Sequence, residues 1–231
     1  STVQLIKSGS PAAVALETST DWKNWTTYTV WDTITLTNIW DKVYWRTSSE
    51  TDTTFTTNAG SYYNFVMTWS IAWSWDVNYL LNKNSTNTLN NYCFLNLFYW
   101  CSQLTEAPEL PATTLANRCY YNMFTNCTNL TTAPELPATT LADFCYYEMF
   151  ASCSFTTAPE LPATTLAMYC YYQMFISCSK IKLSTTKTWA YQTAYRIPTT
   201  WTGSAGTGSM SYMFDSTWWT FTGTPSINTT Y

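Results

Sequence analysis

The sequence contains no histidine among its 231 residues. This absence excludes Ser-His-Asp and Cys-His nucleophile pairs, HExxH zinc sites and any imidazole proton shuttle. Charged residues make up only 10% of the chain, whereas an ordinary soluble domain has about 25%. The net charge of -4 also argues against the clustered Lys and Arg of a nucleic-acid-binding surface. We therefore expect no nucleic-acid partner.

Long apolar runs are missing as well. No run approaches the roughly 18 residues that a membrane-spanning helix needs, so we expect no membrane span. The chain begins at Ser1 without a charged or apolar leader, and we expect any signal peptide to have been removed. Many of the remaining positions are Thr, Ser and Asn, a weakly charged mixture typical of secreted or surface proteins. These features favour an extracellular or cell-surface location.

The residues that are present form an internal repeat. The segment LPATTLANRCYYNMFTNC from Leu110 recurs with small changes from Leu136 and Leu161, and a degenerate first copy begins at Asn91. The first cysteines of the four copies lie 26, 26 and 25 residues apart, and a second cysteine follows each one eight residues later. A period of about 20–29 residues is typical of a leucine-rich-repeat solenoid, in which each coil buries its apolar side against its neighbours.

The repeated LPATTL, CYYNMF and APELP segments resemble the BspA-like leucine-rich repeats of bacterial surface proteins. The resemblance covers about residues 91–183. A weaker fifth copy follows from Ser211, with Met213 and Phe214 in place of the MF pair and Thr217 where the second cysteine would fall. The resemblance implies a non-enzymatic protein that adheres to host cells or matrix proteins, without a cofactor.

Residues 1–78 have a different pattern. Short β-type runs such as VQLIK, TTYTV and NFVMT are separated by turn residues, and their spacing of about 8–12 residues is typical of an antiparallel sandwich. This segment also resembles the β-sandwich module that often precedes such repeats. We expect a sandwich at 1–78, a linker at 79–90, repeats at 91–183, and an insertion with a degenerate terminal repeat at 184–231. The predicted fold class is therefore mostly β with short helices.

One side of each repeat is predicted to carry an exposed aromatic residue. If CYYNMFTNC is a short helix, about 100° per residue places its two cysteines, Tyr120, Met123 and Phe124 on one buried face. The next residue after Tyr120 then points outward. We predict that Tyr121, Tyr147 and Tyr172 form an exposed column and that Tyr120, Tyr146 and Tyr171 are buried. The exposed column is a candidate contact with a partner.

The cysteines allow several interpretations. Cys-x7-Cys spacing without histidine is a poor zinc motif. A disulfide between the two cysteines of one copy fails unless the helix breaks, because eight helical residues rise about 12 Å and the bridge needs Cα atoms within about 7 Å. We favour two ladders of buried free thiols and predict that Cys127, Cys153 and Cys178 are unbridged. Disulfides between neighbouring coils remain an alternative in an oxidising environment.

Acidic residues give no catalytic pair. Glu109, Glu135 and Glu160 recur in the APEL segments, and identical carboxylates stacked about 4.8 Å apart repel one another, so they must face solvent or a cation. There is no Asp-rich loop to support calcium, and we expect no metal site. The three carboxylates are candidate partner contacts. The remaining acids, including Asp21 and Asp41, fit turns better than the acid–base pair of a glycosidase.

Tryptophan is abundant, with 13 residues, and glycine is scarce, with 6. Many of the tryptophans stand in Ser/Thr-rich or Asp-flanked turns, where a chain needs a positive φ or a bare backbone. Trp25 and Trp45 lie inside strand-like runs and look ordinary. Our hypothesis is that many of the other eleven occupy glycine positions, for example through a UGA codon given the wrong amino acid. Genuine exposed tryptophans that stack on a partner are the alternative. The hypothesis predicts positive φ and exposure at several of Trp31, Trp40, Trp100 and Trp218.

Two functions from different classes remain open. The first is a cell-surface binding or adhesion protein that presents a rigid repeat face to a host surface protein or glycan. The second is a structural subunit of an extracellular filament, surface layer or phage particle that associates with copies of itself. An enzyme is the least favoured class.

Overall fold

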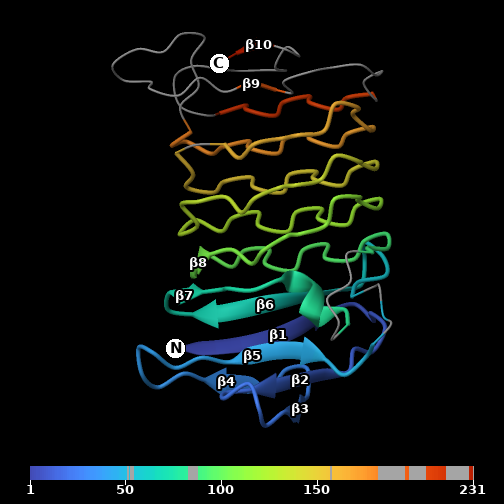
Figure 1. Cartoon of the computed structure of the whole chain (residues 1–231). Helices are drawn as coiled ribbons and strands as arrows, with labels where there is room; N and C mark the ends of the chain where they lie inside the picture. The colour runs from blue at the N-terminus through green and yellow to red at the C-terminus, as the bar shows by residue number, and fades with distance from the viewer. Residues whose placement is uncertain are drawn as a thin grey trace.

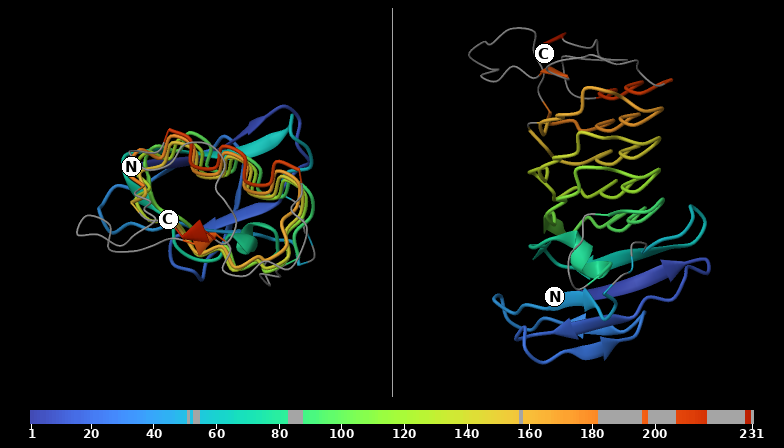
Figure 2. Two further views of the ribbon diagram at one scale, coloured as in Figure 1. Left: turned by 90° about the horizontal axis from the view of Figure 1, so that it is seen from above. Right: turned by 45° about the vertical axis from the view of Figure 1, so that its right-hand side comes forward.

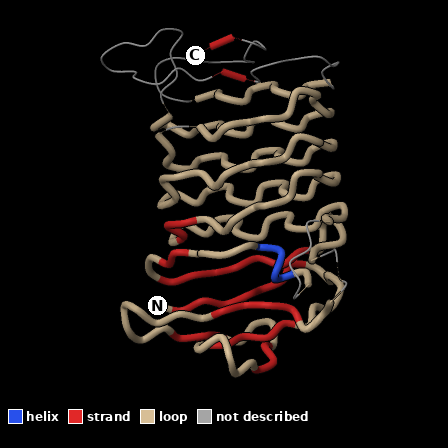
Figure 3. Tube along the Cα trace, in the orientation of Figure 1, coloured by secondary structure: helices blue, strands red, loops and turns tan. Residues whose placement is uncertain are grey.

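The computed structural model describes residues 1–50, 52, 55–82, 88–156, 158–181 and 207–216, together with the backbone of 196–197 and 229–230. The described chain is mostly β, built from short strands and turns (Figures 1 and 3). The helical content of these residues is one 3-10 turn, η1 (Val77–Leu80). The described strands form small sheets, none of which closes into a barrel. Two short strands, β9 (Arg196–Ile197) and β10 (Thr229–Thr230), pair near the C-terminus.

The N-terminal residues form two three-stranded antiparallel sheets. In the first, β1 (Thr2–Ser8) lies between β4 (Thr33–Thr35) and β6 (Tyr62–Thr68). In the second, β2 (Leu16–Ser19) lies between β3 (Thr26–Tyr28) and β5 (Tyr44–Thr47). Buried and less buried residues alternate along β1 and β6, as expected where one face of a strand contacts the core. The predicted small antiparallel strands are therefore confirmed.

An aromatic cluster joins the two sheets. Trp45 of β5 packs edge-on against Phe65 of β6, with ring centroids 5.1 Å apart, and against Tyr28 of β3 at 4.6 Å. Leu5 and Phe65 are fully buried partners across the β1–β6 ladder. Edge-to-face packing of this kind adds to the burial of apolar surface. The cluster fixes β6 in the position from which the repeats begin.

The first repeat is hydrogen-bonded directly to the N-terminal sheets. The backbone N–H of Phe65 donates to Leu97 O at 2.8 Å, and the N–H of Thr56 donates to Cys93 O at 2.9 Å. Further along, β7 (Ile71–Ala72) pairs in parallel with β8 (Leu104–Glu106). The described hydrophobic core runs from Val3 to Phe214 as a single cluster. The division at residues 79–90 stays a prediction, and residues 83–87 lie outside the described part of the chain.

Each repeat forms one layer, and successive layers lie on one another (Figures 1 and 2). The segment 118–127 and its equivalents in the other copies form turns, which we call the turn ribbon. The helix predicted for this segment is therefore wrong. The backbone is left-handed at every fourth residue, with φ of 55° at Arg118, 53° at Asn122 and 63° at Asn126. A regular α-helix cannot contain such residues.

Hydrogen bonding explains why the turn ribbon replaces a helix. The N–H groups of Tyr121 and Met123 donate three residues back, to Arg118 O and Tyr120 O, and close turns. The N–H groups of the intervening residues donate to the next layer, as from Asn122 to Tyr147 O at 2.9 Å. A helix would satisfy all of these groups within its own segment. The turn ribbon instead uses every second N–H to bind the neighbouring layer.

The predicted burial of the inner tyrosines is confirmed although the helix is not, and the predicted exposure of the outer tyrosines is only partial. Tyr120, Tyr146 and Tyr171 are 0%, 2% and 1% exposed, whereas Tyr121, Tyr147 and Tyr172 are partly exposed. The turn ribbon repeats every four residues, or about 90° per residue, which is close to the 100° of a helix. Over one nine-residue segment the two periods therefore bury nearly the same residues.

The layers are held together by stacked aromatic rings. One ladder continues from β6 through all five layers with centroid separations of 5.3 to 5.7 Å, and it comprises Phe65, Phe98, Phe124, Phe150, Phe175 and Phe214. The weaker fifth copy is thus present as a layer over residues 207–216, where Phe175 N–H donates to Met213 O. Thr217 and most of the predicted insertion lie outside the described residues.

All eight cysteines are buried free thiols, so the predicted burial of Cys127, Cys153 and Cys178 is confirmed. The Sγ atom of Cys127 donates to Phe98 O at 3.1 Å, and Cys153 and Cys178 donate to the equivalent carbonyls at 3.2 and 3.0 Å. Each of these three thiols therefore bonds to a backbone group of the preceding layer. Burial raises the pKa of the Cys93 and Cys145 thiols to about 12.

We predict that truncating one member of the phenylalanine ladder strongly destabilises the fold. Phe150 is fully buried between Phe124 and Phe175, and replacing a buried phenylalanine by alanine costs about 3–5 kcal/mol. Chemical denaturation of Phe150→Ala should show this loss. The exposed Glu135→Ala variant is the control and should stay within about 0.5 kcal/mol of the parent. Equal effects of the two variants would contradict the packing described.

We also predict that stability falls at alkaline pH. The thiol of Cys145 has a pKa near 9.0 when unfolded and about 12 when folded. Above pH 9 the unfolded chain loses this proton first, so stability falls with a slope of about 1.4 kcal/mol per pH unit for each such thiol. Denaturation midpoints measured between pH 7 and 10.5 should decrease. In Cys145→Ala the dependence of stability on pH should be shallower by the contribution of one thiol. An unchanged slope would contradict the raised pKa of Cys145.

Candidate functional site

Tyr121, Tyr147 and Tyr172 form a stacked column, which we call the tyrosine column. The rings of Tyr121 and Tyr147 are nearly parallel, with an interplanar angle of 2° and centroids 4.5 Å apart, and the Tyr172 ring follows at 4.8 Å and 15°. Tyr212 of the fifth layer ends the column with its ring edge-on to Tyr172 at 5.8 Å. The backbone sets this spacing, because Glu148 N–H donates to Tyr172 O between the same two layers. The column is therefore held in register by the backbone.

A second column lies beside the first. The Arg118 guanidinium lies 4.2 Å from the ring centroid of Phe144 and 5.6 Å from that of Tyr92, and Phe144 stacks on Tyr169 at 5.1 Å. Phe144 also contacts Tyr147 at 5.9 Å, and Tyr169 contacts Tyr172 at 5.4 Å. The two columns therefore form one surface, which we call the aromatic wall. Its members occupy turn-ribbon positions, so each repeat adds one row to it.

Polar groups on the aromatic wall are mostly neutral. The residue after each column tyrosine is Asn122, Glu148 or Gln173, and all three are partly exposed. Partial burial raises the pKa of the Glu148 carboxyl, and hydrogen bonding from the Tyr147 hydroxyl partly offsets this. Burial and then the Glu148 charge raise the pKa of Tyr147. Aromatic edges, amides and hydroxyls of this kind can bind a partner.

The three repeated glutamates are also where the sequence suggested, at the surface. Glu109, Glu135 and Glu160 are all exposed. The backbone of Glu109 pairs with the segment after β7, since its N–H donates to Trp75 O and its carbonyl accepts from Val77 N–H. Within the described residues, no group of three or more acids or cysteines is arranged to hold a metal ion. Their part in partner contact stays a prediction.

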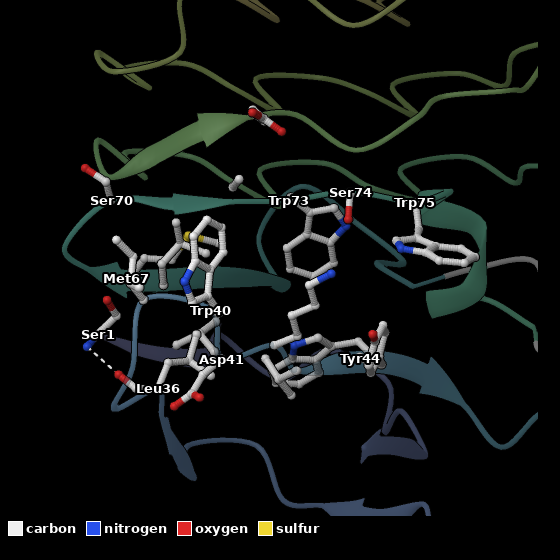
Figure 4. A pocket seen from close by; sticks show the side chains of 18 of the residues that line it. Ser1, Leu36, Trp40, Asp41, Tyr44, Met67, Ser70, Trp73, Ser74 and Trp75 are labelled. Carbon is white, nitrogen blue, oxygen red and sulfur yellow. Dashed lines mark hydrogen bonds between the residues drawn. The ribbon is translucent and has the colours of Figure 1, made fainter. Parts of the chain in front are cut away.

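The sequence did not predict a groove that lies between the N-terminal sheets and the segment after β6 (Figure 4). Its volume is about 350 Å³. Aromatic residues line much of it, namely Trp22, Trp40, Tyr44, Trp45, Trp73, Trp75 and Tyr79. Trp22 and Trp75 stack on each other at 5.1 Å. The abundance of tryptophan was a signal, but residues from five separate segments meet here and no local pattern brings them together.

The acids in and near the groove stabilise turns. Asp41 accepts backbone N–H bonds from Thr37 and Asn38 at 2.7 and 2.8 Å, and bonding to Asn38 lowers its pKa to about 2. Asp76 accepts from Asn78 N–H at 2.7 Å and caps η1. Asp21 accepts from the N–H groups of Lys23 and Asn24, which lowers its pKa. These carboxylates match the turn roles that the sequence predicts for Asp21 and Asp41.

No protein-family model, curated protein or solved structure matches this chain. Across the described residues, no helix has both the length and the apolar character that crossing a bilayer requires. The aromatic wall and the groove are the two surfaces on which a functional proposal can be based.

We predict that Glu148→Gln stabilises the protein at neutral pH. The folded pKa of Glu148 is raised, so the charged form is disfavoured in the folded state and stability falls as pH rises through the carboxyl titration. Thermal unfolding at pH 7 should show a higher midpoint for the variant, and the gain should shrink below pH about 4, where the carboxyl is neutral in both states. Glu135→Gln is the exposed control. A gain that persists at low pH would exclude this electrostatic cause.

Proposed function

We propose that this protein is a non-enzymatic binding protein of the cell surface or extracellular space, and that the aromatic wall contacts a host surface protein or glycan. The repeats are proposed to be a leucine-rich-repeat solenoid of the BspA-like type, preceded by a β-sandwich. The one-layer-per-repeat hydrogen bonding supports the solenoid. The contact between β5 and β6 through Trp45 and Phe65 supports the sandwich.

The tyrosine column is the observation that carries the proposal. Three identical side chains lie in register across three layers and remain partly exposed. Stacking already restricts their rotamers, so little side-chain entropy is lost when a partner binds. Tyrosine also combines a large apolar surface with a hydroxyl that can donate and accept hydrogen bonds, which explains its frequency in binding surfaces.

Self-association into a filament or surface layer is the second candidate. Ile39, in the loop between β4 and β5, is 88% exposed, and an exposed apolar loop tip can contact another copy of the chain. Against this, the edge strands β3 and β4 have only three residues each, and short edges limit strand pairing between molecules. The adhesion proposal is therefore preferred.

We predict that replacing Tyr121, Tyr147 and Tyr172 together by serine weakens partner binding at least about tenfold, because central tyrosines often contribute 1–2 kcal/mol each to an interface. Binding should be measured on a glycan array and on immobilised host matrix proteins, with circular dichroism to verify the fold. The triple variant with alanine at Thr114, Thr140 and Thr165 is the control, since these exposed residues belong to the same three repeats.

The same experiment separates the two candidates. A parent protein that is monomeric by sizing and binds saturably supports adhesion. Unchanged binding by the serine variant would remove the tyrosine column from the proposal. Polymers that form without any ligand, and that Ile39→Ser disperses, would favour the structural role.

A further inference from the structure

The tryptophans divide into two groups by backbone conformation. Among the described residues before the repeats, four residues other than glycine have a positive φ, and all four are tryptophan. Their φ angles are 62° at Trp22, 85° at Trp31, 63° at Trp69 and 84° at Trp75. All four are 40% or more exposed. Left-handed backbone is rare for residues other than Gly, Asn and Asp, and it is an outlier for bulky side chains.

The repeats contain a fifth left-handed tryptophan, which can be compared with the equivalent residues of the other layers. Trp100 has a φ of 61° and is 65% exposed. The same left-handed position in the later layers holds Asn126, Ser152, Ser177 and Ser216. Small polar residues thus occupy this position in all four of the remaining layers. Among the bulky left-handed residues elsewhere in the turn ribbon, Phe144 is packed within the aromatic wall, and Tyr212 is 49% exposed with its ring edge-on to Tyr172.

Three of the other described tryptophans differ in both respects. Trp45 is buried, Trp73 packs against Phe65 and Phe98 at 4.8 and 5.1 Å, and Trp25 lies 3.9 Å below the Arg46 guanidinium. None of the three has a positive φ. Trp73 is therefore an ordinary core residue, contrary to the sequence-based expectation. Trp40 is 84% exposed, as expected, but lacks the expected positive φ.

Two of the eleven suspected positions thus fail the backbone criterion and five satisfy it. Trp189, Trp201, Trp218 and Trp219 lie outside the described residues.

We propose that positions 22, 31, 69, 75 and 100 are glycine in the protein that the source organism makes. Glycine adopts positive φ without a steric penalty, and it is the default residue at such positions. A codon that one genetic code reads as tryptophan and another as glycine would produce this pattern, because every affected codon changes in the same way. Packed tryptophans such as Trp45 would come from the ordinary tryptophan codon. The low glycine content of 6 residues has the same explanation.

The proposal changes the groove. The Trp22 ring contacts Tyr44 at 5.0 Å, Tyr79 at 6.1 Å and Trp75 at 5.1 Å. Glycine at positions 22 and 75 removes both stacked indoles and uncovers the two tyrosine rings. The groove would then be wider, with Tyr44 and Tyr79 as its exposed aromatic surface. The tyrosine column contains none of the five positions, so this inference and the proposed function can fail independently.

The deciding experiment is peptide mass spectrometry on the protein purified from its source organism, with the gene sequenced in parallel. Cleavage after lysine gives a peptide from Asn24 to Lys42 that contains both the control Trp25 and the test position 31. We expect tryptophan at 25 and glycine at 31, and UGA codons at the five positions against UGG at 25, 45 and 73. Tryptophan at the five positions would overturn the proposal.

A stability comparison tests the backbone argument separately. The chain with glycine at all five positions should unfold at a higher denaturant concentration than the chain with tryptophan, because the left-handed backbone no longer carries a bulky side chain. The matched control places glycine at 25, 45 and 73, where it should lower the midpoint. A five-glycine chain that is less stable than the tryptophan chain would contradict the reading of the φ angles.

Discussion

The hydrogen bond from every second N–H of the turn ribbon to the next layer is the constraint on which the rest of the structure depends. It forces a left-handed residue at every fourth position, and it holds equivalent side chains one layer apart. The rings of Phe124 and Phe150 therefore stack at 5.7 Å, and the Cys153 thiol reaches Phe124 O. A helix in this segment would use the same N–H groups internally and leave the layers joined by side chains alone.

Layers of this kind need a partner at each end, because a terminal layer would otherwise expose its apolar face. At the N-terminal end β6 supplies that partner, through the Phe65 bond to Leu97 and the stacking of Phe65 on Phe98. The first repeat departs from the next three at the same place, with Phe94 where they have Tyr120, Tyr146 and Tyr171. The N-terminal sheets therefore serve the repeats as a cap, whatever else they bind.

The layer period, the buried cysteines and the division between inner and outer tyrosines could be predicted from the sequence, since each depends on local spacing. The turn ribbon could not be predicted, because a four-residue period and a helical period bury nearly the same residues over nine positions. The groove could not be predicted either, because its lining residues Trp22, Tyr44 and Trp75 are far apart in the chain. Positive φ at several tryptophans could be predicted because the turn residues that flank them are close in sequence. The prediction for Trp73 was wrong because its packing partners are distant in sequence.

Stacking also constrains what the aromatic wall can recognise. At 4.5 and 4.8 Å the inner faces of Tyr121, Tyr147 and Tyr172 are occupied by one another, so a sugar ring cannot lie between them. A partner meets ring edges and hydroxyls, repeated at the spacing of neighbouring β-strands. Groups with this presentation suit an extended protein surface better than the face of a single sugar. Within the proposed function, the geometry therefore favours a host protein over a glycan at this wall and leaves the groove as the better place for a ring-shaped ligand.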